Sequence, residues 1–336
     1  MTRAQPIEKK TDSENGILFS VVVCTYNRAK LLETLLESLT EQAADPMCFE
    51  VIVVDNNSHD ETKSVCAAAA KRLTNFVYSH EPKQGLSHAR NNGYRAARGV
   101  YVAYLDDECL VPRDWLLVAQ RHARDARPEM MGGPYSCHFE GKRPAWARDS
   151  YFSTVESAGQ EMRALGAEQF IDGGNMFIMR SKLEELGGFD AAFGMSGNRL
   201  GYAEEVDFQK RLVLHDPKAT RLFDPALAVS HMVRKQKLGL WFIVRSRYAN
   251  GLSQGTLRFD EVKNNYDLRL GAFFKFIIRE LWHLSRNVFE AALRRDRQRF
   301  PYFLNALFEE GFTPLERIGV AVSVRRQAKR TKHQKN

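Results

Sequence analysis

The chain has 336 residues, of which 44% are hydrophobic, and it carries a formal net charge of +8. This length and composition can bury a large core, which excludes a disordered protein and favours one large α/β domain with an appended element. The five cysteines are odd in number and form no CxxC pair, so we expect reduced thiols rather than a disulfide framework. No apolar run reaches the length of a membrane span. We expect no secretory signal, and residues 1–17 read as a polar, flexible lead-in.

The positive charge is concentrated at the C-terminal end. From Gly271 onward there are 14 Lys and Arg against 6 Asp and Glu, and the preceding residues carry equal numbers of each sign. This asymmetry indicates an anionic surface met by the C-terminus, either phospholipid headgroups or nucleic acid. No recognised nucleic-acid-binding module accompanies it, so a nucleic-acid partner is not expected.

Strand and helix patterns alternate along the first 105 residues. Short β-branched or aromatic runs are separated by segments with apolar residues at helical spacing, which predicts a mostly parallel sheet flanked by helices. Neither GxGxxG nor a P-loop follows the first run, which argues against a dehydrogenase-type dinucleotide fold. Strands are expected at residues 19–24, 50–55, 76–78 and 101–105, and helices at 28–42, 60–73 and 87–98.

Three consecutive carboxylates, Asp106, Asp107 and Glu108, follow the last of these strands. The crevice beyond the carboxyl ends of parallel strands is where open α/β sheets bind ligands. Acids gathered there repel one another unless a cation lies among them, and Mg²⁺ or Mn²⁺ bridging to substrate phosphates fits such oxygen ligands. The alternative is a solvated turn that happens to be acidic.

Asp55 ends the second strand and is expected at the same edge of the sheet. Its carboxylate could accept a hydrogen bond from the N–H of a nucleotide base. The alternative is an Asx turn or N-cap leading into the next helix.

A further acidic group lies at residues 204–207. On a helix, Glu204 and Asp207 would share a face with Arg211, whereas Glu205 would point elsewhere. A glutamate held toward a ligand cleft could act as a general base. An ordinary surface helix with ion pairs four residues apart explains the same pattern.

From about Tyr266 the pattern becomes helical again, with apolar residues spaced four and three apart. One interpretation is an amphipathic helix on an anionic bilayer surface, and the other is a helix that covers the core and ends in a solvated tail. The apolar stripe consists of Leu270, Phe274, Ile277, Leu281, Leu284 and Val288.

Taken together, these motifs resemble the family 2 glycosyltransferases of the GT-A fold, which are inverting, nucleotide-sugar-dependent enzymes that build bacterial surface polysaccharides. The resemblance covers roughly residues 19–231 and rests on ordered motifs at 22–28, 53–58, 85–93, 105–108, 173–176, 187–190 and 204–205. Glu108 and Glu205 stand where the family usually has aspartates.

The resemblance implies a role for each motif. Glu205 would be the catalytic base, with Glu204 as the alternative, and the metal, Mg²⁺ or Mn²⁺, would be bound by Asp106, Glu108 and His231. The acceptor side would include Gly173, Gly174, Asn175 and Asp207. The nucleotide sugar would contact Thr25, Tyr26, Asn27, Arg28, Asp55, Asn57, Gly85, Arg90, Asp106 and Asp107.

The expected protein moves a sugar from a nucleotide-diphosphate donor to a hydroxyl of a saccharide or polyprenyl-diphosphate-linked acceptor. It would work in the cytoplasm as a peripheral protein on the inner face of the plasma membrane. The alternative is a catalytically silent relative that binds sugar nucleotides or acts as a scaffold. After the lead-in, the expected divisions are a nucleotide-sugar half (18–125), an acceptor half (126–265), a helical extension (266–324) and a basic tail (325–336).

Overall fold

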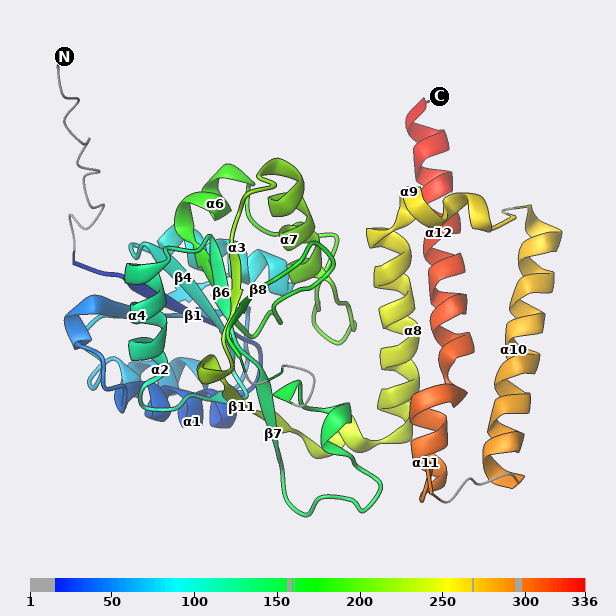
Figure 1. Cartoon of the computed structure of the whole chain (residues 1–336), viewed down its shortest axis with the longest axis horizontal. Helices are drawn as coiled ribbons and strands as arrows, with labels where there is room; N and C mark the ends of the chain where they lie inside the picture. Colours follow the sequence, from blue (N-terminus) through cyan, green and yellow to red (C-terminus); the bar gives the residue numbers. More distant parts are fainter. Residues whose placement is uncertain (1–15, 156–158, 160, 268, 294–297, 336) are drawn as a thin grey trace.

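The computed structural model describes residues 16–155, 159, 161–267, 269–293 and 298–335, and it consists of a sheet region followed by a helical region (Figure 1). Nearly all of the predicted lead-in, residues 1–15, lies outside the described residues. The α/β class and the C-terminal helices agree with the prediction from sequence.

Within the described residues the main sheet has the strand order β3-β2-β1-β4-β9-β6-β10-β8. The first four of these strands are parallel, as predicted, while β9 runs antiparallel between β4 and β6. The strands are β1 (Phe19–Thr25), β2 (Phe49–Asp55), β3 (Phe76–His80), β4 (Tyr101–Asp106), β6 (Met130–Gly132), β8 (Arg163–Ala164), β9 (Asn175–Met179) and β10 (Arg221–Phe223).

A smaller sheet of order β5-β11-β7 lies next to the end of β4. It consists of β5 (Cys109–Leu110), β7 (Tyr135–Phe139) and β11 (Val229–Val233). β11 runs antiparallel to β5, so that His231 pairs with Cys109, the residue that follows the acidic triplet. The small sheet therefore brings two segments more than 100 residues apart to one place.

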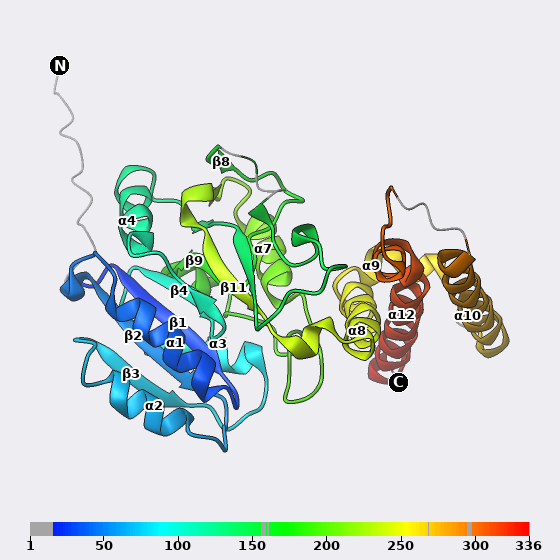
Figure 2. The same ribbon diagram turned by 90° about the horizontal axis from the view of Figure 1, so that it is seen from below.

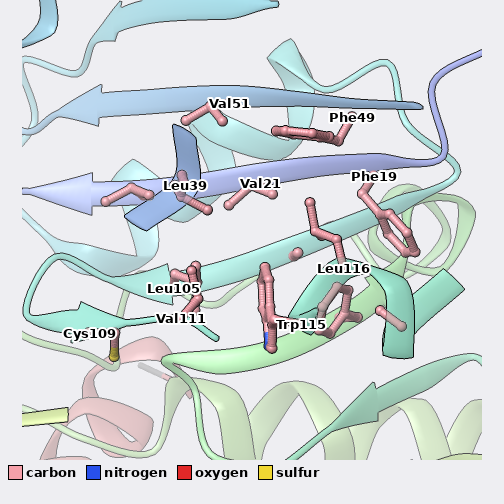
Figure 3. Packing of buried hydrophobic residues seen from close by; sticks show 14 of the residues in the cluster. Phe19, Val21, Leu39, Phe49, Val51, Leu105, Cys109, Val111, Trp115 and Leu116 are labelled. Atoms are coloured by element: carbon pink, nitrogen blue, oxygen red, sulfur yellow. The ribbon is translucent and has the colours of Figure 1, made fainter. Parts of the chain in front are cut away.

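Helices cover both faces of the main sheet. They are α1 (Ala29–Thr40), α2 (Thr62–Ala69), α3 (Leu86–Ala96), α4 (Trp115–Asp125), α6 (Arg180–Glu185) and α7 (Glu204–His215). Alternate residues of a strand point to opposite faces, so Val21 packs with Leu39 and Trp115 on one face (Figure 3), while Val22 packs with Phe208 on the other. Burial of each such side chain contributes about 1.5–3 kcal/mol to the stability of the fold. Because both faces of the strands are packed in this way, the ends of the strands are held in place.

The helical region begins earlier than predicted, at α8 (Leu240–Leu257). It continues with α9 (Phe259–Val262), α10 (Leu270–Leu293), α11 (Phe303–Ala306) and α12 (Thr313–Lys335). Short 3₁₀ segments occupy Pro46–Cys48, Asp149–Tyr151, Pro225–Leu227, Lys235–Leu238 and Lys263–Asn265, and a π-helical turn occupies Leu307–Gly311. The predicted basic tail is the end of α12 as far as Lys335.

Figures 1 and 2 show α8 next to the sheet region, α12 beside it and α10 outermost. The α8–α12 contact is close because both helices present glycines. A Cβ atom at Gly251 would overlap the carbonyl oxygen of Glu316, and one at Gly319 would overlap that of Tyr248. Apart from Ile243, the buried positions of α8 are small residues such as Ala249 and Ser253, which explains why its sequence lacks a helical apolar stripe.

The apolar stripe predicted for α10 is divided between two faces. Leu284 and Val288 pack against the rest of the helical region, while Phe274 and Leu281 are about half exposed. Apolar side chains cover most of the circumference of this helix, so the stripe lies along the boundary of the buried face. Within the described residues, no helix is both long and apolar enough to cross a bilayer.

Candidate active site

A cavity of about 610 Å³ lies at the carboxyl ends of β1 and β4 and extends to α8 and α12. Most of the residues that the sequence nominates line it. They are Thr25, Tyr26, Arg28, Arg90, Asp106, Asp107, Glu108, Gly173, Gly174, Glu204, Glu205 and His231.

Other nominated residues support the nucleotide loop without lining the cavity. The carboxylate of Asp55 accepts hydrogen bonds from the backbone N–H of Ser58 at 2.8 Å and from the Tyr78 hydroxyl at 2.8 Å. This is the turn that the sequence left open as an alternative for Asp55. Asn27 and Asn57 both have positive φ, and the Asn27 side chain accepts from the backbone N–H of His59 at 2.7 Å.

Three further nominated residues also lie outside the cavity lining. Asn175 is fully buried, and its amide donates to the carbonyls of Gly133 and Leu227. Asp207 forms an ion pair with Arg211 at 2.8 Å. Gly85 precedes α3 with φ +151°, a conformation that favours glycine. We therefore leave Asn175 and Asp207 out of the acceptor site proposed below.

Asp107 anchors the loop that follows β1. Its buried carboxylate accepts hydrogen bonds from the Thr25 hydroxyl at 2.8 Å and from Arg28 at 2.7 Å. Burial raises the pKa of Asp107 despite the neighbouring Arg28 charge. With both oxygens engaged by protein groups, Asp107 positions Arg28 at the cavity.

The expected metal ligands come together at the end of β4. Nε2 of His231 lies 3.7 Å from a carboxylate oxygen of Asp106 and 3.2 Å from one of Glu108. Burial alone would raise the pKa of Asp106, but the hydrogen bond from His231 and the charge of Arg90 lower it. Burial would likewise lower the pKa of His231, but the two carboxylates raise it.

Glu108 is surrounded by cations that the sequence reasoning missed. Lys237 forms an ion pair with one of its oxygens, and Nε of Arg234 lies 2.7 Å from the other. These contacts and the His231 hydrogen bond lower the pKa of Glu108 well below its usual range, although burial opposes them. The basic run from Arg234 to Lys237, which begins three residues after His231, was the available signal.

The side chains gathered at the end of β4 are of the kinds that bind a hard divalent ion. Carboxylate oxygens and imidazole nitrogen suit Mn²⁺ or Mg²⁺. Asp106, Glu108 and His231 all line the cavity, although both oxygens of Glu108 are paired, one with Lys237 and the other with Arg234. In their present positions, however, no three His, Cys, Asp or Glu side chains of the described residues form a metal-ligating group. Glu108 would have to exchange Lys237 for the ion.

Arg90 ties the centre of the site together. Its buried guanidinium donates to Glu204 at 2.7 Å and to the carbonyl of Gly173 at 3.0 Å. A Cβ atom at Gly173 would lie 2.8 Å from this guanidinium, and one at Gly174 would overlap the carboxylate of Asp106. The glycine pair therefore makes room for the two charged side chains.

Glu204 and Glu205 have different environments. Glu204 is buried and paired with Arg90, whereas the Glu205 carboxylate has no ion pair and no side-chain hydrogen-bond partner within the described part of the chain. Burial and the nearby Glu204 charge raise the pKa of Glu205 to about 8. Asp172, which the sequence reasoning missed, also lines the cavity, and burial and the charge of Asp106 raise its pKa to about 6.

A known protein family matches the chain. The family model described as "Glycosyl transferase family 2" matches residues 20–187, which is half of the chain. The chain belongs to this family. The resemblance noted from the sequence is thereby confirmed.

Two relatives illustrate the kind of glycosyltransferase to which the chain is similar. The succinoglycan biosynthesis protein ExoM of Rhizobium meliloti is 27% identical over 240 residues, which cover 70% of this chain and 73% of ExoM. A GalNAc(5)-diNAcBac-PP-undecaprenol beta-1,3-glucosyltransferase of Campylobacter jejuni is 35% identical over 133 residues, which cover 37% of this chain and 42% of that enzyme.

Solved structures of glycosyltransferases share the GT-A fold with this one. The mannosyltransferase PcManGT from Pyrobaculum calidifontis, in complex with GDP-Man and Mn²⁺, matches with a TM-score of 0.53 and 21% identity, covering 94% of this chain and 79% of that one. S. aureus TarS 1–349 in complex with UDP-GlcNAc gives a TM-score of 0.54 and 18% identity, covering 95% of this chain and 93% of that one.

Proposed function

We propose that this glycosyltransferase moves a sugar from a nucleotide-diphosphate donor to a hydroxyl of a saccharide or lipid-linked saccharide acceptor, with inversion and the help of a divalent ion. The observation that carries the proposal is the Glu205 carboxylate, which lines the same cavity as Asp106 and His231 and, unlike Glu204, forms no ion pair within the described residues. The polysaccharide relatives support a role in surface polysaccharide assembly.

In the proposed reaction Glu205 accepts the proton of the acceptor hydroxyl, whose oxygen attacks the anomeric carbon as the bond to the diphosphate breaks. One displacement with one base inverts the anomeric configuration. A base whose pKa lies near the working pH transfers protons efficiently, and the raised pKa of Glu205 meets that condition. Arg90 keeps Glu204 paired, so of the two adjacent glutamates Glu205 is the available base.

Positive charge at the other side of the site would bind the leaving diphosphate. Arg28, Arg234 and Lys237 line the cavity and lie around Glu108. Asp106, Glu108 and His231 would hold the divalent ion, which when bound neutralises charge that grows on the departing phosphate oxygens.

The proposal is tested by thermal shift of the full chain with UDP, GDP, dTDP and CMP, each with and without Mn²⁺. A ligand that binds only the native state raises the melting temperature. We expect a metal-dependent rise with one nucleotide, which would also identify the donor class. No rise with any nucleotide would contradict a donor site here, whereas binding without transfer or donor hydrolysis would favour a catalytically silent relative.

We also propose peripheral attachment to the anionic inner face of the plasma membrane. The outer face of α10 exposes large apolar side chains next to Lys275 and Arg286. Apolar area together with basic residues is what holds amphipathic helices at lipid headgroups. The exposed residues are Leu270, Phe274, Ile278, Leu281, Trp282, Phe289 and Leu293.

Vesicles containing phosphatidylglycerol test the attachment. The double variant Trp282→Glu and Phe289→Glu should lose most cosedimentation with them. The matched control is Leu214→Glu, because Leu214 of α7 is 82% exposed and lies outside α10. This variant should sediment like the parent chain. Equal sedimentation of all three proteins would contradict the membrane proposal.

A further inference from the structure

The helical region forms one wall of the catalytic cavity. Phe242, Arg247 and Asn250 of α8 line the cavity together with Phe308 of the π-helical turn and Glu316 of α12. Figure 2 shows these helices on the opposite side of the molecule from β2 and β3. The nucleotide loop after β1 and this helical wall therefore lie at different ends of the cavity.

Glu205 lies next to the helical wall. Tyr202, three residues before it, donates its backbone N–H to the Ser253 hydroxyl at 3.1 Å, and its hydroxyl lies 2.9 Å from that of Ser246. Both serines belong to α8. The segment that carries the proposed base is thus fixed to α8, and an acceptor hydroxyl reaching Glu205 from this side would pass along the helical wall.

The side chains of the wall combine aromatic rings with neutral hydrogen-bonding groups. Phe242, Phe152 and the Tyr151–Phe308 pair, whose rings stack with centroids 4.3 Å apart, supply the aromatic surface. Arg247 is neutralised by Glu316 at 2.9 Å. The half-buried amide of Asn250 has no hydrogen-bond partner among the described residues, although it lines the cavity.

We infer that this helical wall is the acceptor subsite and that it takes an uncharged saccharide, an inference that rests on the proposed function. Sugar rings present apolar C–H faces and hydroxyl edges, which aromatic rings and amide or hydroxyl groups match. A bare lipid chain would leave the side-chain amide of Asn250 without a partner, which is unfavourable. An anionic acceptor would be repelled by the Glu316 carboxylate, which already neutralises Arg247.

The acceptor subsite continues outward into a second cavity of about 500 Å³. The two cavities share Tyr151, Arg247 and Phe308, and the second adds Arg148 and Glu309, which are paired at 2.8 Å. As with Arg247 and Glu316, the positive charge of Arg148 is neutralised by Glu309. The continuous path from Glu205 to the surface fits an oligosaccharide rather than a single sugar.

The test applies the labelled full chain, with each of UDP, GDP, dTDP and CMP plus Mn²⁺, to an array of neutral and anionic microbial oligosaccharides. We expect binding to neutral oligosaccharides. Asn250→Ala should weaken it about five- to tenfold, the usual effect of losing one hydrogen bond to a ligand. The matched control is Gln254→Ala, because Gln254 is an amide one helical turn further along α8 and does not line the cavity, so its binding should equal that of the parent chain.

Several outcomes would overturn the inference: no binding to neutral glycans, binding to anionic glycans alone, or equal binding by Asn250→Ala and the parent. The thermal shift with nucleotides separates this failure from failure of the proposed function. A chain that binds a nucleotide and Mn²⁺ but no neutral glycan refutes the acceptor subsite alone. A chain that binds neutral glycans but no nucleotide refutes the donor site alone.

Discussion

The carboxyl edge of the sheet and the helical region differ in which side chains they bury and which they expose. At the sheet edge, Arg90 and Glu204 are buried as an ion pair. Glu108 lies beside His231, Arg234 and Lys237. In the helical region, glycines bring α8 and α12 into close contact, while α10 leaves large apolar side chains exposed.

This difference separates two tasks. Buried ion pairs rarely add net stability, because desolvation of the charges offsets their attraction, but they hold side chains at defined positions for chemistry. Close packing of small residues instead fixes the distance between two helices and so the shape of the wall that α8 and α12 form. Changes at the sheet edge should therefore alter catalysis or leave charges unpaired, and changes in the helical region should alter packing.

The largest expected effect is on catalysis at the sheet edge. Glu205→Gln should lower sugar transfer about 10²- to 10⁴-fold, the contribution of a general base, while nucleotide binding measured by thermal shift is retained. Glu184→Gln, an exposed carboxylate of α6, should transfer like the parent chain. If Glu205→Gln keeps more than half of the parent rate, the base is Glu204 or Asp172.

The next effect is on stability. Arg90→Met leaves the Glu204 carboxylate buried without its partner, so the free energy of unfolding should fall by about 3–5 kcal/mol in urea denaturation. Arg258→Met breaks the exposed pair with Glu261 and should change the free energy of unfolding by less than about 1 kcal/mol. Equal changes in the two variants would mean that the Arg90–Glu204 pair is not the buried anchor described here.

Packing in the helical region should respond to a single methyl group. Gly251→Ala places a Cβ atom against the backbone of Glu316, and overpacking of this kind destabilises by about 1–3 kcal/mol. At Gly271, in α10, nothing lies within 4 Å of an added Cβ atom. Gly271→Ala should therefore be neutral or stabilise by up to about 1 kcal/mol. Circular dichroism during thermal unfolding measures both, and a neutral Gly251→Ala would disprove the close contact.

The last expected effect is on pH dependence. Because the pKa of Glu205 is raised from 4.5 to about 8 in the folded protein, the fold keeps a proton that the unfolded chain releases. Stability should then fall as pH rises through this window, and transfer should increase toward pH 8 as the base ionises. Glu205→Gln should remove this part of the pH dependence, raising the melting temperature at pH 8 by on the order of a few degrees. Parallel melting curves for parent and variant at pH 5 and 8 would contradict it.

The regular elements of the first half could be predicted because their buried residues are large and follow a clear period. Val21, Val23 and Val51 lie on one face of buried strands, as their runs indicate. The sequence also predicted that Asp106 and Glu205 would reach one cavity, although their roles there remain predictions. The antiparallel insertion of β9 beside β4 could not be read from a five-residue apolar run.

The environments of other residues could not be read from the sequence because they depend on long-range contacts. Asn175 belongs to a glycine-rich motif that resembles a binding segment, yet its partners are backbone carbonyls from two distant turns. Asp172 gains its raised pKa only from burial beside Asp106. The start of α8 was missed because glycine and serine usually indicate turns, whereas here they form a helix contact.

The pairing of α8 with α12 has a consequence for how the protein is made. All strands of the two sheets precede Val233, so the sheet region can assemble while the last helix is still within the ribosome. The glycine face of α8 has no partner until α12 emerges more than 55 residues later. We therefore expect two folding events during synthesis, with the wall of the cavity completed only in the second.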